Sequence, residues 1–497
     1  MKSLLAELKG FSQSRAEVVA IEGEEVSLTY AELVDSVSAV ARFLTSHDIH
    51  AVALLADNGP LWCVADLACA QAEITLIPIP HFFSPMQTSH LLRSAGVDAM
   101  LTEQPEQALL LIEQLGLAYN PPLSVSVAGY PLSLIQLTVS NVELPADCAK
   151  LTFTSGSTGE PKGVCLRQKV MEQVAKSLAT VTAANSDDRH LALLPYATLL
   201  ENIGGLYAPL FTGATVIAPS LASVGLSGAS GLDVSRFVGI LIQSRASSCI
   251  MIPQMLHALV AAIESGAPKP EALRFIAVGG APVSPALLKR AEKLGLPVFE
   301  GYGLSEAASV VAVNAPGQCK PGSVGKLLPH VTVRFADDGE ILVKGALFSG
   351  YLGDKSREGE VWPTGDIGYM DEEGFLFLSG RKKHIFITAF GRNVSPEWVE
   401  RELSIEPAIA QCCVFGEAQP FNVAVIVARD HITPEQVSLA VEQANARLPD
   451  YAKVSKWLIA NEPFCVANGL WTGTSRPRRE QIYAAYDDRL TILYQEC

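Results

Sequence analysis

The sequence predicts an α/β protein with a large N-terminal domain and a small C-terminal one. Three observations support this. A strand–helix–strand rhythm runs through the first 300 residues, short alternating strands follow beyond Val324, and a smaller α+β unit extends from about Gly380 to the end. At 497 residues the chain is also too long for one ordinary core. We expect helix-covered, largely parallel sheets and a small β-barrel-like subdomain in residues 1–379, and the second domain in residues 380–497.

The N-terminal region alternates helical and strand patterns. Apolar spacing predicts a helix over residues 28–44, a buried strand over 51–55, a helix over 62–72 and a strand over 74–78. The pattern recurs at four later strands, namely 215–218, 249–252, 275–278 and 298–300. Strands that alternate with helices predict a parallel sheet covered by helices.

Beyond Val324 the pattern changes to hairpins. Alternating runs at 331–335, 341–344 and 375–378 are separated by the turn-forming segments Asp337-Asp338-Gly339 and Asp371-Glu372-Glu373-Gly374. One further stretch, 219–231, is rich in Ser, Gly and Ala and is predicted to be a loop.

Composition excludes several classes of protein. The net charge of −15 disfavours binding to nucleic acid. The first seven residues do not read as a signal peptide, and no apolar run is as long as a transmembrane segment, although a peripheral membrane contact stays open. Scattered cysteines without a C-x-x-C pair indicate reduced thiols and a cytoplasmic protein.

The segment from Thr154 to Gly163 combines hydroxyls, glycines and a lysine after a strand-like lead-in. Glycines let a backbone approach a ligand, and successive N–H groups can bind an anion. The segment therefore predicts a polyphosphate loop, although it departs from the P-loop pattern at Pro161. The alternative interpretation is a flexible polar loop. The candidate binding residues are Thr154, Ser155, Gly156, Ser157, Thr158, Gly159 and Lys162.

Three later turns carry further candidates. Strands end at Gly279-Gly280-Ala281-Pro282 and at Glu300-Gly301-Tyr302-Gly303-Leu304-Ser305-Glu306, where open α/β sheets bind ligands. The second turn offers an aromatic ring for stacking on a base and carboxylates for Mg²⁺. Thr364-Gly365-Asp366 adds a carboxylate that could bind a ribose diol. Each turn alone also fits ordinary packing or capping.

Taken together, these motifs resemble the superfamily of adenylate-forming enzymes: acyl-CoA synthetases, stand-alone adenylation domains and luciferase. The matching segments are TSGSTGEPKG, GGAP, GYGLSE, TGD and GRKKHIFITAFGRNVSPEWVE, and they occur in the family's order over essentially the whole chain. The resemblance implies a large domain of sandwiched sheets, a small mobile domain, and ATP with Mg²⁺.

The resemblance also assigns roles to individual residues. The loop of residues 154–162 would bind the β- and γ-phosphates, with Lys162 supplying charge. The adenine would lie between Tyr302, next to Gly303, and the segment of Gly280, Ala281 and Pro282. Ser305 would contact the α-phosphate, and Glu306 with Thr158 would ligate Mg²⁺. Asp366 would bind the ribose with help from Arg381, and Lys383 would be the hinge between two half-reactions.

The C-terminus departs from the family pattern. Members present a lysine in a T-x-T-G-K-x-x-R context, whereas this chain has Arg476 at the lysine's position. Charge is kept, but a guanidinium is not interchangeable with an ammonium. The alternative interpretation of the three nearby arginines is a solvated tail. Displacement at a phosphate needs charge neutralisation more than a side-chain base, so we interpret His257, His330 and His384 as structural.

The segment Leu194-Pro195-Tyr196-Ala197-Thr198-Leu199-Leu200-Glu201 most closely resembles long-chain acyl-CoA synthetases, with Thr198 in place of a histidine. No aspartate lies between Pro195 and Gly213 to pair with an α-amino group, which disfavours an amino-acid substrate. The candidate acid pocket consists of Leu199, Leu200, Gly204 and Tyr207, which suit an aliphatic or an aryl acid; the same residues would also fit plain core.

We therefore expect an AMP-forming acid–thiol ligase that activates a carboxylic acid, in the first place a fatty acid, and transfers it to CoA. One alternative is an acyl-AMP ligase that loads the phosphopantetheine of an acyl carrier protein. A third hypothesis, motivated only by Arg476, is an acyl- or nucleotide-binding protein that has lost catalysis.

Overall fold

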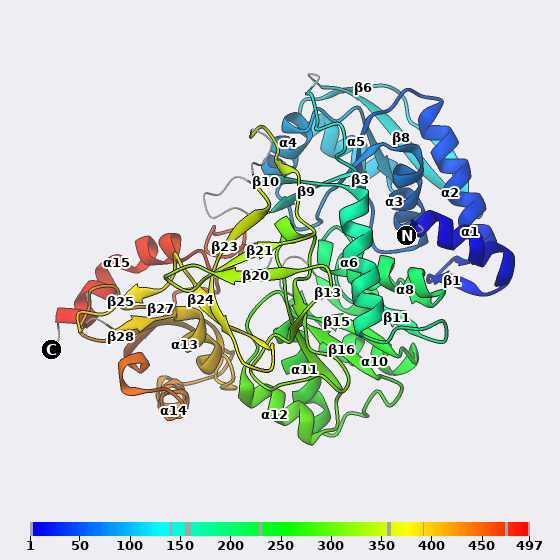
Figure 1. Ribbon diagram of the computed structural model, residues 1–497. Helices are drawn as coiled ribbons and strands as arrows, with labels where there is room; N and C mark the ends of the chain where they lie inside the picture. Colours follow the sequence, from blue (N-terminus) through cyan, green and yellow to red (C-terminus); the bar gives the residue numbers. More distant parts are fainter. Residues whose placement is uncertain are drawn as a thin grey trace.

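The computed structural model describes residues 3–139, 142–154, 161–227, 231–354, 359–390, 392–472 and 476–495. A large N-terminal body and a smaller C-terminal unit lie side by side, with the C-terminal unit at the left of Figure 1. Two nine-stranded sheets form the frame of the large body.

The first sheet has a parallel centre with antiparallel flanks. Its strands lie in the order β22 (Gly350–Tyr351), β10 (Lys162–Leu166), β9 (Lys150–Thr154), β4 (Thr75–Pro78), β3 (Ala51–Leu55), β5 (Ala99–Thr102), β8 (Tyr130–Thr138) and β6 (Ala118–Tyr119), and β7 (Leu123–Val127) also pairs with β8. Strands β9, β4, β3 and β5 are parallel. They are buried on both faces and rich in Val, Leu, Ile and Ala, as central parallel strands are.

The second sheet repeats this arrangement. Its order is β19 (Lys326–Leu327), β18 (Ala312–Val313), β17 (Val298–Tyr302), β16 (Phe275–Val278), β15 (Ser248–Met251), β11 (Arg189–Leu191), β12 (Thr215–Ile217), β1 (Val19–Glu22) and β2 (Ser27–Thr29). The run from β17 to β1 is parallel. The predicted parallel sheets are therefore confirmed, and they number two.

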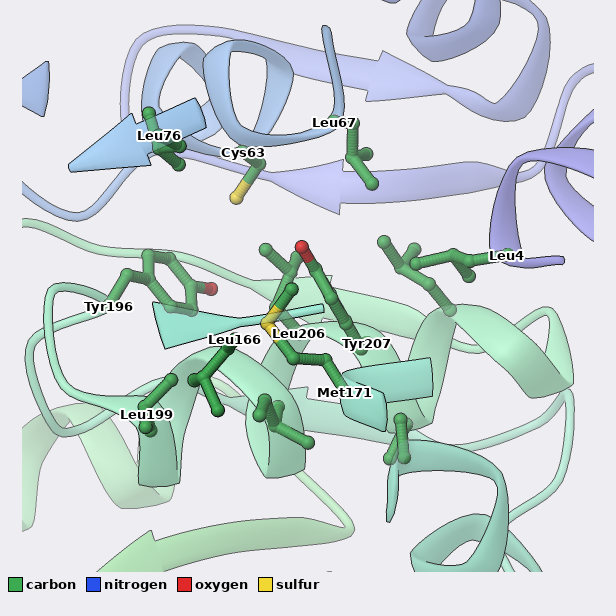
Figure 2. Packing of buried hydrophobic residues seen from close by; sticks show 14 of the residues in the cluster. Leu4, Cys63, Leu67, Leu76, Leu166, Met171, Tyr196, Leu199, Leu206 and Tyr207 are labelled. Carbon is green, nitrogen blue, oxygen red and sulfur yellow. The ribbon is translucent and has the colours of Figure 1, made fainter. Parts of the chain in front are cut away.

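Helices form three layers around the two sheets. The middle layer packs between the sheets and contains α1 (Leu4–Ser14), α2 (Tyr30–Thr45), α3 (Pro60–Ala72), α6 (Gln168–Val181) and α8 (Ala208–Thr212). Figure 2 shows its core, with Cys63 and Leu67 of α3 facing Leu206 and Tyr207 across the layer. Helix α3 is apolar and buried around nearly its whole circumference, as expected for a central helix.

The outer helices cover the remaining faces. On the second sheet lie α10 (Val234–Gln243), α11 (Pro253–Glu264) and α12 (Pro285–Lys293), whereas α4 (Pro85–Ser94) and α5 (Pro105–Gln114) cover the first. Several helices begin at the expected caps. In α2, for example, Thr29 and Glu32 form a capping box.

A separate antiparallel sheet corresponds to the predicted β-barrel-like subdomain. Its strands are β20 (Thr332–Phe335), β21 (Glu340–Lys344), β23 (Val361–Met370) and β24 (Leu376–Arg381), and it is an open sheet. The turns at residues 337–339 and 371–374 connect its strands as predicted. The predicted boundary between residues 379 and 380 lies inside β24.

The C-terminal unit is a compact α+β structure. A short hairpin, β25 (Phe386–Ile387) and β26 (Asn393–Val394), precedes the sheet of β27 (Ile409–Phe415), β28 (Asn422–Ala428) and β29 (Val454–Ile459). One face of the sheet packs on α13 (Pro396–Leu403) and α14 (Pro434–Asn445), and the other on α15 (Arg479–Gln495). A single 3₁₀ turn, η3 (Asp450–Ala452), leads into β29.

The prediction of a loop over residues 219–231 is wrong. Residues 228–230 lie outside the described residues, and the described part of the segment forms a short helix, α9 (Leu221–Val224), and the strand β13 (Leu226–Ser227), which pairs with β14 (Gly231–Leu232). Ser220 caps the helix by accepting a hydrogen bond from the backbone of Ser223, and Gly225 ends it at φ +92°. Small residues here act as helix caps. In the part of the chain that the structure describes, no helix is long and apolar enough to cross a membrane.

Candidate active site

One cavity of about 3300 Å³ extends between the large body and the C-terminal unit. Its wall includes every described candidate residue except Tyr207, whereas the candidates Ser155 to Gly159 lie outside the described residues. The structure thus brings together residues that are more than 300 positions apart in the sequence.

Strands β9 and β10 form the hairpin that carries the phosphate-loop motif. Thr154 ends β9 directly opposite Lys162, the first residue of β10. The Thr154 hydroxyl lies 3.5 Å from the carbonyl oxygen of Lys162, and the Lys162 side chain is exposed toward the cavity. The lysine is therefore free to contact an anion that binds at the end of the hairpin.

The GGAP segment and the GYGLSE segment lie beside each other because β16 and β17 are parallel neighbours. Both motifs follow the carboxyl ends of these strands, which is where open α/β sheets bind ligands. Gly280 adopts φ +83°, a conformation that favours glycine. A Cβ atom on Gly303 would lie 1.5 Å from the carbonyl oxygen of Ser309, so this turn also requires glycine.

Tyr302, Asp366 and Arg381 form a hydrogen-bonded cluster on one wall. The Tyr302 hydroxyl donates to Oδ2 of Asp366 at 2.6 Å, and Nε of Arg381 lies 2.9 Å from Oδ1. Asp366 and Arg381 are direct partners in the β23–β24 ladder, which fixes their spacing. Burial raises the pKa of Asp366 despite the opposing charge of Arg381 and the bond from Tyr302. Each carboxylate oxygen keeps a lone pair for a further donor.

Glu306 lies in the 3₁₀ turn η2 (Ser305–Ala307) just after the GYGL turn. Its Oε1 accepts a 2.5 Å hydrogen bond from Tyr351, and the ring of Tyr351 lies 5.3 Å from Nζ of Lys162. Mg²⁺ is usually bound through one or two carboxylates together with substrate phosphates. A single oriented carboxylate beside the phosphate hairpin fits that requirement. No group of three or more His, Cys, Asp or Glu side chains that could hold a metal by itself is found within the described ranges.

Arg476 connects the C-terminal unit to the large body. Its Nη2 donates a 2.6 Å hydrogen bond to the carbonyl oxygen of Gly280, in the GGAP turn. The lysine-replacing arginine is thus at the cavity wall in this structure. Lys383 also lines the cavity, two residues after the end of β24.

The acid-pocket candidates separate into two groups. Leu199 and Leu200 of the short helix α7 (Leu199–Glu201) line the cavity together with Gly204 of the π-helix η1 (Asn202–Tyr207). Tyr207 does not: it is fully buried in the middle layer, with its hydroxyl 3.3 Å from Nζ of Lys150. The apolar spacing that suggested a pocket residue marks core at this position.

The only acidic residue in the acid segment is unavailable to a ligand. Glu201 is fully buried, accepts hydrogen bonds from Nε2 of His190 at 3.0 Å and from the backbone of Leu194 at 3.0 Å, and thereby holds the turn before α7. Burial raises the pKa of Glu201, although the bond from His190 opposes this effect.

Sequence reasoning missed two side chains beside the site. Tyr351 lies outside every motif, so the sequence carried no signal for its contact with Glu306. Glu397 lies inside the long C-terminal motif, and its carboxylate is bound by His384 and by Ser395 at 3.1 Å. Although burial acts to raise it, the bond from His384 and the charge of Arg479 lower the pKa of Glu397 to about 2. The position of Glu397 inside this motif, close to the predicted hinge, was a signal that could have identified it as a site residue.

Two protein-family models together match most of the chain. The model for the AMP-binding enzyme family matches residues 9–352, and that for the AMP-binding enzyme C-terminal domain matches residues 383–497. The long-chain-fatty-acid–CoA ligase FadD15 of Mycobacterium bovis is 27% identical and covers 96% of this chain and 94% of its own length.

Two solved structures have the same fold. The anthranilate CoA ligase AuaEII, in complex with anthranoyl-AMP, has a TM-score of 0.81 at 20% identity and covers 97% of both chains. The O-succinylbenzoate coenzyme A synthetase of Bacillus subtilis, in complex with ATP and magnesium ion, has a TM-score of 0.75 at 24% identity and covers 96% of this chain and 98% of its own. The fold class predicted from the sequence is confirmed, and all three similar proteins are named as CoA ligases or synthetases, the acid–thiol ligase class that the motifs predict.

Proposed function

We propose that this chain, which belongs to the AMP-binding enzyme family, activates a fatty acid with ATP and transfers the acyl group to CoA. The observation that carries the proposal is one cavity whose wall holds the Tyr302–Asp366–Arg381 cluster, Glu306 and Arg476. The resemblance of the sequence motifs to those of adenylate-forming enzymes supports the same reaction for this chain.

In the first half-reaction the carboxylate of the acid attacks the α-phosphate of ATP and releases pyrophosphate. Asp366 accepts hydrogen bonds from the ribose hydroxyls, and Tyr302 stacks against the adenine. Gly280, Ala281 and Pro282 form the opposite side of the adenine pocket. These contacts hold the nucleotide, so that the reaction depends on alignment and on charge neutralisation.

Lys162, Ser305, Arg476 and Thr154 contact the phosphates. Glu306, oriented by Tyr351, is the side chain that would hold Mg²⁺, with Thr158 as a second ligand. When bound, the metal supplies positive charge to the phosphate oxygens. The synthetase with ATP and magnesium ion on the same fold supports this choice of nucleotide and metal.

The acid substrate is an aliphatic chain rather than an amino acid. Beyond Leu200 and Gly204 the cavity wall continues with apolar side chains, among them Leu178, Ile250 and Phe275. Glu201 is already bonded to His190 and cannot pair with an α-amino group. The similarity to a long-chain-fatty-acid–CoA ligase favours a fatty acid, whereas the anthranilate ligase makes an aryl acid the second candidate.

In the second half-reaction the C-terminal domain turns at Lys383 and Arg476 leaves the nucleotide. The thiol of CoA then attacks the acyl carbon of the acyl-adenylate, which forms the thioester and releases AMP. We place the division between the domains at the end of β24, close to residues 379 and 380. The carrier-protein phosphopantetheine remains the alternative acceptor, and a cytoplasmic location stays a prediction.

The test is carboxylate-dependent exchange of labelled pyrophosphate into ATP, measured across saturated acids of increasing length, benzoic-type acids and amino acids. Exchange should require both Mg²⁺ and an acid, with the best activity on a fatty acid. CoA and a phosphopantetheinyl carrier protein are then compared as acceptors. Formation of ADP and phosphate in place of AMP and pyrophosphate would refute the proposal.

A further inference from the structure

A buried ion pair lies between the two large sheets, outside the cavity. Nζ of Lys150 is 2.5 Å from Oδ1 of Asp66, and the two side chains are 3% and 0% exposed. Asp66 comes from helix α3, and Lys150 is the first residue of β9, the strand that ends at Thr154. No part of the proposed reaction uses this pair.

Residues at both ends of the π-helix η1 contact the ion pair. At its start, Asn202 accepts a hydrogen bond from Nζ of Lys150, and its Nδ2 donates to Oδ2 of Asp66 at 3.4 Å. At its end, the hydroxyl of Tyr207 lies 3.3 Å from the same Nζ. Figure 2 shows this hydroxyl directed toward α3, where Cys63 and Leu67 lie.

This convergence depends on the π-helical geometry. Asn202 and Tyr207 are five residues apart. At 100° per residue, an α-helix would separate two such side chains by roughly 140° around its axis, whereas the neighbours on one α-helical face are three or four residues apart. A π-helix closes with bonds between residues i and i+5, which brings the two side chains to one side. The π-helical geometry therefore lets both Asn202 and Tyr207 contact the ion pair.

The same helix forms part of the cavity wall at the candidate acid pocket. Gly204 lines the cavity, and a Cβ atom there would lie 2.9 Å from Cδ1 of Ile250. A Cβ atom on Gly205 would lie 1.9 Å from Oε1 of Glu201. A return of this segment to an α-helical register would rotate these two glycines relative to the cavity wall and place larger neighbours there.

We propose that the Lys150–Asp66 ion pair, with Asn202 and Tyr207, is a positioning device that fixes the π-helix and thereby sets which acids fit the cavity. The acid-selectivity part of this inference rests on the proposed function. Buried ion pairs contribute little net stability, but a buried polar group can fix the register of a helix. Lys150 and Asp66 act through the helix and are positioning residues.

The principal test is the double variant Lys150→Met/Asp66→Leu, which removes both charges and leaves neither one buried alone. The milder Tyr207→Phe removes one hydroxyl and keeps the ring. The matched control is Arg447→Met, which breaks a partly buried pair with Glu402 in the C-terminal unit, at 3.0 Å, without touching η1. The first measurement is hydrogen–deuterium exchange of the amides of residues 202–207.

The exchange experiment does not depend on any enzymatic activity. The double variant should exchange these amides at least about tenfold faster, because local opening is no longer opposed by the ion pair. Tyr207→Phe should give a smaller change in the same segment, and Arg447→Met none. Unchanged exchange in a folded double variant, or in Tyr207→Phe if the double variant does not fold, would overturn the proposal.

The second measurement is the ratio of kcat/KM for a long and a short saturated acid. The double variant should change this ratio at least about fivefold, while KM for ATP stays within about twofold because the β9–β10 ladder still holds Thr154. A purely structural role would lower activity on every acid equally, and that outcome would also refute the positioning role. A wild-type protein that activates no acid refutes the proposed function, and the exchange measurement then still decides the inference.

Discussion

The hydroxyl of Tyr351 lies 2.5 Å from Oε1 of Glu306. This bond restrains a carboxylate that would otherwise sample several rotamers on its half-buried turn. Tyr351 comes from β22, which pairs with β10 of the phosphate hairpin, so Tyr351 connects the metal-binding candidate to the phosphate strand.

Tyr351→Phe should therefore raise the Mg²⁺ concentration that pyrophosphate exchange requires. Loss of a hydrogen bond to a charged group costs about 1.5–3 kcal/mol, and we expect an increase of roughly tenfold in the apparent Mg²⁺ constant. Tyr369→Phe, at an exposed position of β23, is the control and should change nothing. An unaltered Mg²⁺ titration of folded Tyr351→Phe would show that Glu306 does not need this bond or does not bind the metal.

Asp366→Ala should raise the apparent KM for ATP by at least about tenfold, because two ribose hydroxyls lose charge-assisted hydrogen bonds of about 1.5–3 kcal/mol each. Tyr302→Phe keeps the carboxylate and removes only one of its restraints, so its effect should be smaller. Nucleotide affinity is measured by isothermal titration and by the initial rate of exchange. Equal affinity in wild type and a folded Asp366→Ala variant would remove this residue from the ribose site.

Glu300 gives the protein a specific dependence on pH. Burial raises the pKa of this β17 carboxyl to about 7, although the Arg401 guanidinium in the C-terminal unit and a backbone bond from Val283 oppose the shift. The folded-state pKa is above the unfolded value, so the stabilising contribution is complete below about pH 4.3 and is lost as pH rises toward about 7.

Glu300→Gln stays neutral at every pH and should remove this loss. Its melting temperature relative to wild type should rise between pH 5 and pH 8, by at least about 2 °C, and become constant above that range. Differential scanning calorimetry at four pH values measures the difference. An equal dependence of melting temperature on pH in the variant and the wild type would mean that Glu300 titrates at its ordinary pKa.

Arg476 and Lys383 should separate the two half-reactions. Arg476→Ala should slow adenylation by about 10²–10³, the usual loss for one electrostatic contact to a transition state, and should spare transfer from preformed acyl-adenylate to CoA. Arg476→Lys should retain much of the activity. Lys383→Pro should spare adenylation and slow transfer to CoA, because a fixed φ prevents rotation at the hinge.

The two rates are followed separately, by pyrophosphate exchange and by thioester formation from acyl-adenylate. Arg478→Ala is the control for charge in the same tail. Equal slowing of both steps by Arg476→Ala would show that this arginine does not replace the family's lysine.

Gly204→Val should shorten the acids that the enzyme accepts. The new Cβ would lie 2.9 Å from Cδ1 of Ile250, and both residues line the cavity, so activity on long acids should fall by at least about tenfold more than activity on short acids. KM for ATP should not change. Gly239→Ala, where a Cβ meets nothing within 4 Å, is the matched control. A uniform loss for all acids would place Gly204 outside the acid path.

The sequence predicted the elements whose signals are local. The strand at Ala51–Leu55 and the strand at Phe275–Val278 were predicted at these bounds, because each is a short apolar run between turns. The loop predicted over residues 219–231 failed because small residues can cap a helix as readily as they can form a coil. Which strand would join which of the sheets, and in what order, could not be predicted, since strand order depends on contacts distant in the sequence.

The same distinction applies to the site. Motif residues such as Asp366 could be named because their patterns are contiguous. Tyr351 could not be found, because only the pairing of β22 with β10 brings it to Glu306. Tyr207 shows the opposite error: its apolar spacing is the same for a pocket wall and for the core, and only the tertiary structure distinguishes them.

The direct pairing of Asp366 with Arg381 in the β23–β24 ladder has one more consequence. Lys383 follows Arg381 by only two residues, so a domain that turns at Lys383 does so about a point fixed to the ribose-binding side chains. The nucleotide could then stay bound to the large domain while the small domain rotates. Under the proposed hinge, release of AMP and reorientation of the small domain would be independent events.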